Sequence, residues 1–301
     1  MIGNRALVSV VMCCYNAERY IKQTIDSVLN QTFRDFEFIV WNDGSTDSTE
    51  AIIKSYKDER IRYFYHENAG LGQSLKWACE KVTSEYIARI DADDICVENR
   101  LEKEYHFMQS HPKCALVFSG AILIDENDCI IGQTIPYTRP SIIRKLIKRF
   151  DSIIMHPSVM IRKSSYFKTQ QYPLVEGFED TVLWYQLIDQ GDFCAIKEPL
   201  IKYRFLSNSL SHGYRQTKYR RVIVELRKII IKEFGMDTFD NNIHSALFSQ
   251  AKVEYKKQKN PHYHRKKIDE KLLNRLSRLL GERSALTLIC FIKNIYAMIK
   301  Y

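Results

Sequence analysis

Apolar and polar positions alternate in blocks along the first hundred residues. Short, continuous apolar runs, which are typical of strands covered on both faces, occur at 6–12, 36–41, 61–65 and 86–90. The segments that follow the first three runs repeat apolar residues at helical spacing, and they are residues 17–31, 45–56 and 71–82. Strands that alternate with helices in this way predict an α/β fold with a mainly parallel sheet flanked by helices.

Beyond Pro112 the pattern is less regular. Further short strands are predicted at 114–124, 130–135, 155–161 and 195–205, with a helix at 180–190. After about residue 207 the composition becomes helical and basic. We therefore expect three parts, which are the first half of an α/β domain at 1–111, its second half at 112–206, and a basic helical C-terminal region at 207–301.

The positive charge is concentrated at the end of the chain. The whole sequence has a formal charge of +9, but residues 1–200 contain 23 Lys and Arg against 28 Asp and Glu, whereas residues 201–301 contain 22 against 8. This asymmetry disfavours a protein that binds nucleic acid over its whole surface, so nucleic acid is not an expected partner. The basic region at 207–301 is suited to an anionic membrane surface, and a solvated basic surface is the alternative.

Cysteine spacing and apolar segments bear on the location of the protein. The eight cysteines show no CxxC pair and no zinc-type spacing, which is typical of reduced, buried thiols. The first residues lack a signal-peptide cleavage pattern, and the apolar stretch at 285–299 is shorter than the roughly 20 residues that span a bilayer. We expect a cytoplasmic protein that attaches peripherally to the inner face of the cell membrane.

Polar residues directly follow three of the predicted strands, and the carboxyl ends of parallel strands share one edge, where ligands bind. These residues are Cys13 to Asn16, Asn42 to Gly44, and Asp91 to Asp94. Three carboxylates among four residues favour a hard cation such as Mg²⁺ or Mn²⁺; the alternative is a solvated turn that caps the next helix. The sequence contains no GxGxxG after its first strand and no GxxxxGK[ST], which disfavours dinucleotide binding and P-loop hydrolysis.

Three sequence segments, taken in their order along the chain, indicate a fold and function more specifically than any one of them alone. They are VVMCCYN at 10–16, WNDGSTD at 41–47 and EYIARIDADD at 85–94. Together they closely resemble the nucleotide-sugar-binding half of glycosyltransferase family 2, which has the GT-A fold. The resemblance continues through HPSVMIR at 156–162 and EDTVLW at 179–184, and it covers about 6–212. It implies that 1–111 bind the nucleotide sugar and that 112–206 bind the acceptor and carry catalysis.

The resemblance also implies roles for individual residues. The nucleotide sugar would be bound by Cys13, Tyr15, Asn16, Asp43, Asp91, Ala92 and Asp93. A Mn²⁺ or Mg²⁺ ion would be held by Asp93 in the first place, with Asp94 and Asp91 as further candidate ligands. Asp180 would be the general base, for which an acid that merely favours a helix N-terminus is the alternative.

Three further residues are candidates for acceptor binding or positioning. Glu179 would position its neighbour Asp180. His156 would contact acceptor or phosphate, or else be satisfied structurally before Pro157. Trp184 would belong to the core or stack on a sugar. Two positions depart from the family pattern, because Cys13 stands where proline is usual and Lys76 stands where close relatives often carry asparagine.

The predicted activity is a metal-dependent, inverting transfer of a sugar from a nucleoside-diphosphate sugar, with UDP expected, to an acceptor hydroxyl. The acceptor would be a glycan or lipid-linked glycan in surface polysaccharide assembly. A nucleotidyltransferase is one alternative, although CCYN after the first strand is not a phosphate-binding loop. A non-catalytic module that binds sugar nucleotides or polyanions is the other, and the paired acids at 179–180 disfavour it.

Overall fold

The computed structural model describes residues 6–148, 153–173 and 179–206. Expectations for the basic region at 207–301 therefore lie outside the described residues. The strands are β1 (Val8–Cys14), β2 (Phe36–Asp43), β3 (Ile61–His66), β4 (Tyr86–Arg89), β5 (Ile95–Cys96), β6 (Cys114–Ile124), β7 (Ile130–Gln133), β8 (Val159–Arg162) and β9 (Asp192–Arg204). The helices are α1 (Ile21–Leu29), α2 (Thr49–Ser55), α3 (Leu71–Glu80), α4 (Arg100–Ser110), α5 (Pro140–Lys148), α6 (Lys163–Tyr166), α7 (Glu179–Leu187) and the 3₁₀ helix η1 (His156–Ser158).

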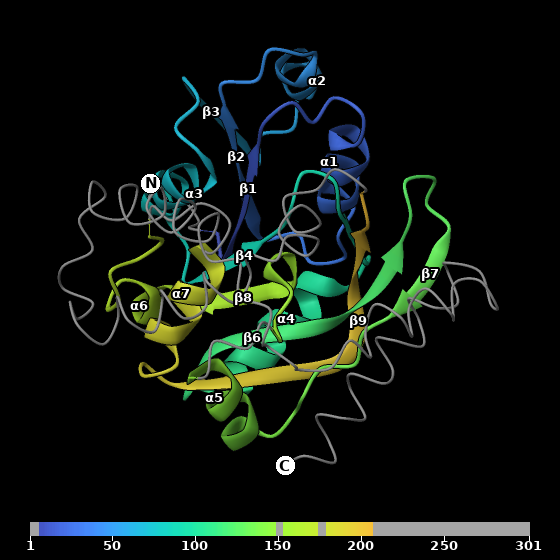
Figure 1. Cartoon of the computed structure of the whole chain (residues 1–301). Coiled ribbons are helices and arrows are strands. Elements are labelled where there is room, and N and C mark those ends of the chain that lie inside the picture. The colour runs from blue at the N-terminus through green and yellow to red at the C-terminus, as the bar shows by residue number, and fades with distance from the viewer. Residues whose placement is uncertain (1–5, 149–152, 174–178, 207–301) are drawn as a thin grey trace, which may run out of the picture. The chain divides into compact units, whose positions relative to one another are not determined.

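The strands of the described residues form one sheet in the order β3-β2-β1-β4-β8-β6-β9-β5, with β7 paired to β6 (Figure 1). Strands β1 to β4 pair in parallel, whereas β8 is antiparallel to both β4 and β6. The predicted α/β fold is therefore confirmed. The parallel part is the first half of the chain, and the second half continues the sheet with mixed strand directions.

Chain contacts divide the protein into two units. The first comprises Met1–Ala121 and Pro136–Tyr203, and it contains every candidate site residue named above. The second comprises Ile122–Ile135 and Arg204–Tyr301. Within the described part of the second unit, Arg204 pairs with Asp128 at the turn of the β6–β7 hairpin.

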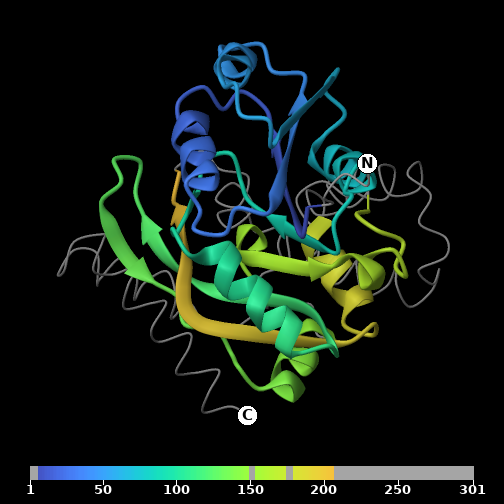
Figure 2. The same cartoon turned by 180° about the vertical axis from the view of Figure 1, so that it is seen from behind.

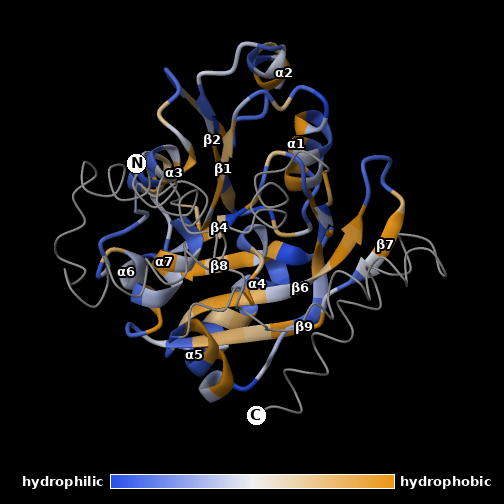
Figure 3. Ribbon diagram, in the orientation of Figure 1, coloured by the Kyte–Doolittle hydropathy of each residue, from blue (hydrophilic) through white to orange (hydrophobic). Residues whose placement is uncertain are grey.

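Helices cover both faces of the sheet in the first unit (Figure 2). Alternation along β1 sends Val11 and Cys13 into a core that includes residues of α3 and α7, whereas Val10 and Met12 join a second core with α1 and α4. Apolar colour follows the strands and the sheet-facing sides of the helices in Figure 3. The long apolar runs of the sequence are explained by this burial on both faces.

A buried ion pair fixes the end of β4 against β8. Arg100 is fully buried and its Nε donates to Glu104 Oε1 at 3.0 Å, while its Nη2 donates to the carbonyls of Arg89 (2.8 Å) and Val159 (3.2 Å). Burial raises the pKa of Glu104 to about 7, although Arg100 opposes that shift. The arginine therefore holds together the two strands next to the acidic segment at 91–94.

Several element boundaries differ from those predicted. Residues 155–161 were expected as one strand, but His156–Ser158 form η1 and the strand begins at Val159, because Pro157 cannot donate to a ladder. Strand β9 is longer than predicted and β7 is shorter, while β5, α5 and α6 were not expected. Within the part of the chain that the structure describes, no helix has both the length and the apolarity needed to cross a membrane.

Candidate active site

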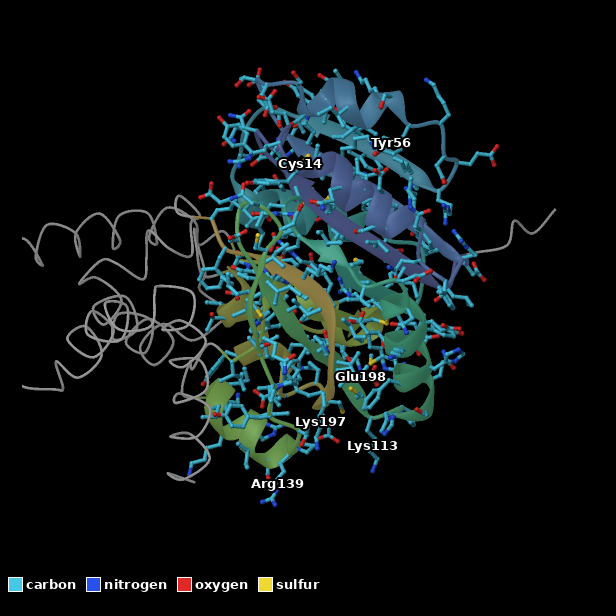
Figure 4. The ribbon with its side chains drawn as sticks, turned by 90° about the vertical axis from the view of Figure 1, so that its right-hand side faces the viewer. Cys14, Tyr56, Lys113, Arg139, Lys197 and Glu198 are labelled. Carbon is cyan, nitrogen blue, oxygen red and sulfur yellow. The ribbon has the colours of Figure 1, made fainter. Side chains whose placement is uncertain are left out.

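The candidate site lies at the carboxyl ends of β1, β2 and β4. These strands are parallel neighbours, so the loops that follow them meet at one edge of the sheet. Figure 4 shows Cys14, at the end of β1, well separated from Lys113, Lys197 and Glu198. The charged residues in the middle of β9 and before β6 are therefore not part of this site.

The loops after β1 and β2 are fastened to each other. The backbone N–H of Asn16 donates to Ser45 Oγ at 3.0 Å, and the N–H of Thr46 donates to Asn16 Oδ1 at 2.9 Å. Asn16 has a φ of 49°, in the left-handed region that asparagine tolerates. Tyr15 is 52% exposed beside it, so its ring is accessible to a ligand.

Asp43 anchors the loop between β3 and α3. Its side chain is nearly fully buried, and its two carboxylate oxygens accept the N–H groups of Ala69 (2.8 Å) and Gly70 (3.1 Å). Asn68 Nδ2 donates to the Asp43 carbonyl at 3.1 Å. Each carboxylate oxygen has a second lone pair, so this structural role is compatible with a further contact to a nucleotide base.

A glycine is required at position 44, where the turn after β2 approaches the loop between β3 and α3. Its φ is 73°, and a Cβ at this position would lie 2.5 Å from the backbone nitrogen of Asn68. A side chain would therefore meet both backbone strain and a backbone clash. The sequence predicted a sharp turn here, and the structure adds the close approach of the β3–α3 loop.

The acidic segment after β4 is held by its backbone. Thr24 Oγ1 of α1 donates to the carbonyls of Ala92 (3.0 Å) and Asp94 (2.8 Å). The Asp94 side chain is buried, whereas Asp91 and Asp93 are partly exposed. Asp91 and Asp93 are thus the two carboxylates of this segment that a ligand in solution can reach.

The carboxylate oxygens of this segment are ligand atoms that suit a hard divalent cation. Two accessible carboxylates match the way Mg²⁺ or Mn²⁺ binds proteins, through one or two carboxylates with phosphate oxygens of a substrate. Among the described residues, no group of three or more His, Cys, Asp or Glu side chains is arranged to hold a metal ion by itself. Any metal at this edge would therefore need ligand oxygens to complete its coordination.

The fold brings Glu179 and Asp180 to the acidic segment. Burial, with smaller contributions from the charges of Asp180 and Asp91, raises the pKa of Glu179 to about 8, although a backbone hydrogen bond and Arg89 oppose the shift. Glu179 lies beside His156, just before β8, and β8 pairs with β4, so the first turn of α7 lies near β4 although the two are far apart in sequence. Asp180 Oδ1 accepts the N–H of Thr181 at 2.5 Å.

His156 lies next to Glu179, and Trp184 packs against His156. His156 Nε2 is 2.8 Å from the Tyr172 hydroxyl, and its Nδ1 is 3.8 Å from Glu179 Oε1. Burial and the charge of Arg89 lower the pKa of His156 well below its usual range, so the imidazole is neutral. Trp184 packs edge-on against His156 with ring centroids 5.7 Å apart and is almost fully buried, which places it in the core.

The remaining predicted positions lie around the same edge. The Cys13 thiol is buried in the core shared with α3, and burial raises its pKa, so it is held as a neutral thiol. A base pocket at this position would involve the backbone rather than the side chain. Ala92 is buried and its carbonyl accepts the Thr24 hydroxyl, and Lys76 is half-buried on α3.

Sequence reasoning missed three residues of the site. Arg89 pairs with Asp91, Tyr172 contacts His156, and His66 Nε2 lies 3.6 Å from Asp43 Oδ1. Arg89 carried a signal in the sequence, because a charged residue at the end of an otherwise apolar, buried strand is costly unless it is paired. Tyr172 and His66 had no such signal.

Comparison with known proteins identifies the family. The model described as "Glycosyl transferase family 2" matches residues 9–169. The putative teichuronic acid biosynthesis glycosyltransferase TuaG of Bacillus subtilis (strain 168) is 33% identical over 216 residues, which is 70% of this chain and 84% of that protein.

Solved structures share the fold. TarS 1–349 of S. aureus in complex with UDP-GlcNAc has a TM-score of 0.62 and 17% identity, and the match covers 92% of this chain and 81% of that chain. The mannosyltransferase PcManGT from Pyrobaculum calidifontis in complex with GDP-Man and Mn²⁺ has a TM-score of 0.55 and 16% identity, covering 97% and 88%. The fold is therefore GT-A, and with the matched family model, the chain belongs to glycosyltransferase family 2.

Proposed function

We propose that this protein transfers a sugar from a nucleoside-diphosphate sugar to a hydroxyl of a glycan or lipid-linked glycan, with inversion, in polysaccharide assembly. One observation carries the proposal. The accessible acids follow β4, where Asp91 pairs with Arg89, and the acid pair that begins α7 lies beside His156, just before the strand that pairs with β4. Such a site has one group of acids for the leaving diphosphate and another for the attacking hydroxyl.

The donor would lie over the ends of β1, β2 and β4. Exposed Tyr15 can stack on a nucleotide base, Asp43 has lone pairs left for it, and Asp91 can accept hydrogen bonds from a ribose hydroxyl. The preferred donor is a UDP-sugar, which is supported by the resemblance in fold to TarS, solved in complex with UDP-GlcNAc.

Asp93 and Asp91 would hold a Mn²⁺ or Mg²⁺ ion together with the donor phosphates, and Asp94 is less suited because its side chain is buried. Such an ion neutralises charge on the leaving diphosphate when it is bound. The Mn²⁺ in the PcManGT complex supports this assignment.

Asp180 would accept the proton of the attacking hydroxyl. A positioned general base of this kind contributes about 10²–10⁴-fold to the rate. Attack on the face opposite the leaving diphosphate gives inversion in one displacement. Glu179 is less suited to the role of base, because burial holds it protonated at neutral pH, with a pKa of about 8.

The test compares two carboxyl-to-amide variants at the two ends of α7. Asp180→Asn should keep UDP affinity in calorimetry with Mn²⁺ and lose about 10²–10⁴-fold in transfer, measured with a panel of UDP- and GDP-sugars. Asp189→Asn is the matched control, since Asp189 follows the other end of the helix and pairs with Arg144 and Lys148. Near-normal transfer by Asp180→Asn would refute its role, and a wild-type protein that neither binds nor hydrolyses any nucleotide sugar would refute the proposed function.

The donor-binding assignment and the metal have their own measurement. Asp93→Ala should weaken UDP binding in the presence of Mn²⁺ and leave the weaker, metal-free binding unchanged. The domain boundaries at 111 and 206 and the cytoplasmic, membrane-peripheral location belong to the same proposal. They are supported by the sequence alone.

A further inference from the structure

Arg89 is a buried cation at the floor of the candidate site. It is the last residue of β4, and only 1% of its surface is exposed. Alternation along the strand puts it on the same face as Ile87, which packs in the core that includes Leu75 of α3 and Leu183 of α7. Its guanidinium therefore lies on the side of the sheet from which α7 presents Glu179 and Asp180.

The charges around Arg89 come from two separate parts of the chain. Its Nη1 pairs directly with Asp91 Oδ1, two residues further along. Its charge also acts on Glu179 at the start of α7 and on His156 and Tyr172, which lie beside Glu179. One fixed positive charge thus faces both the acidic segment at 91–94 and the acid pair at 179–180.

The arrangement is not explained by stability alone. A buried guanidinium is favourable only with full hydrogen bonding, and a buried ion pair often stabilises no more than apolar side chains of similar size. Arg89 Nη1 is paired with Asp91, and within the described residues no hydrogen-bond partner is found for its Nε and Nη2. Glu179 Oε2 is likewise without one. A buried polar group without a partner in the protein calls for an explanation, and a role in a functional site is one.

Without Arg89, the carboxylates of Asp91 and Asp180 would repel each other with no cation beside them. Both charges raise the proton affinity of Glu179, whereas Arg89 lowers it. Glu179 itself is protonated at neutral pH, so removal of the arginine charge would leave two like charges, on Asp91 and Asp180, in a region of low dielectric constant. Asp91 is partly exposed, so its carboxylate could then turn towards solvent, and the first turn of α7 could move away from β4.

We propose that Arg89 is a positioning residue: its guanidinium holds the Asp91 carboxylate in place for the donor and keeps the acid pair of α7 beside it. The functional part of this inference rests on the proposed function, because Asp91 is assigned to the donor and Asp180 to the acceptor hydroxyl. The structural part, that Arg89 fixes the distance between the two groups of acids, does not depend on it.

The first experiment tests the structural part on the full chain. Crystal structures of the wild type and Arg89→Met should differ at the site, with the Asp91 carboxylate turned to solvent and Glu179 displaced from β4 in the variant. Methionine keeps much of the arginine volume and removes the charge. Unchanged positions of Asp91 and Glu179 would overturn the inference, whether or not the protein transfers sugars.

The second experiment separates positioning from a general loss of stability. Arg89→Met should weaken UDP binding in the presence of Mn²⁺ about tenfold and lower kcat by at least as much, while Arg89→Lys, which retains the charge, should recover most of both losses. In the Asp91→Asn background, Arg89→Met should cost little further UDP affinity, since the two residues act through one pair.

Arg204→Met is the matched control, because Arg204 is also a buried arginine with an acidic partner, Asp128 of the β6–β7 hairpin. It should lower the melting temperature and leave the UDP affinity of the folded protein within about threefold of the wild type. Equal losses of UDP affinity in Arg204→Met and Arg89→Met, or no rescue by lysine, would overturn the inference. If the wild type binds UDP and transfers sugar normally, such a result leaves the proposed function intact.

Discussion

Substitution of Asp43 by asparagine tests the contact that organises the edge of β2. The carboxylate accepts one backbone N–H on each oxygen, from Ala69 and from Gly70. An asparagine side chain has only one accepting oxygen, so one of these two N–H groups must lose its partner and face an NH₂ group. The β3–α3 loop should therefore open more often in the variant.

The magnitude follows from the exposure of the loop. A hydrogen bond to a charged group contributes about 1.5–3 kcal/mol, and an unsatisfied buried donor costs about 1–3 kcal/mol. Ala69 is exposed and Gly70 is partly exposed, so a released N–H can bind water instead. We therefore expect a loss near the lower end, about 1–2 kcal/mol in the free energy of unfolding.

The assay is urea unfolding combined with hydrogen exchange of the loop amides. Asp43→Asn should unfold at lower urea, and the amides of Ala69 and Gly70 should exchange about tenfold faster. Asp125→Asn is the matched control, because Asp125 Oδ1 accepts the N–H groups of both Asn127 and Cys129, so the asparagine oxygen can retain both. An unchanged midpoint with unchanged exchange at 69 and 70 would contradict the role given to Asp43.

Three further predictions concern the turn, the buried acid and the basic region. Gly44→Ala should lower the free energy of unfolding by about 1–3 kcal/mol, since the φ of this residue is 73° and the added Cβ would meet the backbone of Asn68. Thermal melting measures this loss, and an unchanged melting temperature would contradict the close approach of Gly44 to the β3–α3 loop. In the folded protein the pKa of Glu104 is raised from 4.5 to about 7, so the folded state binds this proton more tightly than the unfolded state does. The free energy of unfolding should therefore fall as the pH rises from 4.5 through 7. Glu104→Gln should flatten that pH dependence in urea unfolding between pH 4.5 and 8, and an identical slope in both proteins would argue against the shift. The chain should float with anionic liposomes at low salt and stay unbound with neutral liposomes, because the surplus of Lys and Arg lies in residues 201–301. If the same fraction of protein floats with both kinds of liposome, electrostatic binding to the membrane is ruled out.

The family and the first half of the fold follow from local sequence. The apolar runs gave the positions of β1 to β4, and their order with helices gave parallel pairing, because periodicity reports how each segment is covered by its neighbours. The same order placed the polar residues after β1, β2 and β4 at one edge. Motif order alone was sufficient to indicate glycosyltransferase family 2.

The second half of the fold was less predictable. Proline within the segment at 155–161 shortens β8, and short elements such as β5 and α6 carry too few residues for a periodic pattern. The positions of β8 and β5 depend on antiparallel pairing with β4 and β9, respectively, which no local pattern specifies.

At the site, the sequence determined which side chains are present, and the tertiary structure decided what each of them contacts. Asp43 could be named from the sequence as a turn residue and a candidate contact for a base, and packing of the β3–α3 loop gives it two backbone donors. Arg89 was an unremarked charge within a motif until α7 was packed against the same face of the sheet. Such partnerships are long-range, and they form because burial of apolar faces brings together charged groups that lie far apart along the chain.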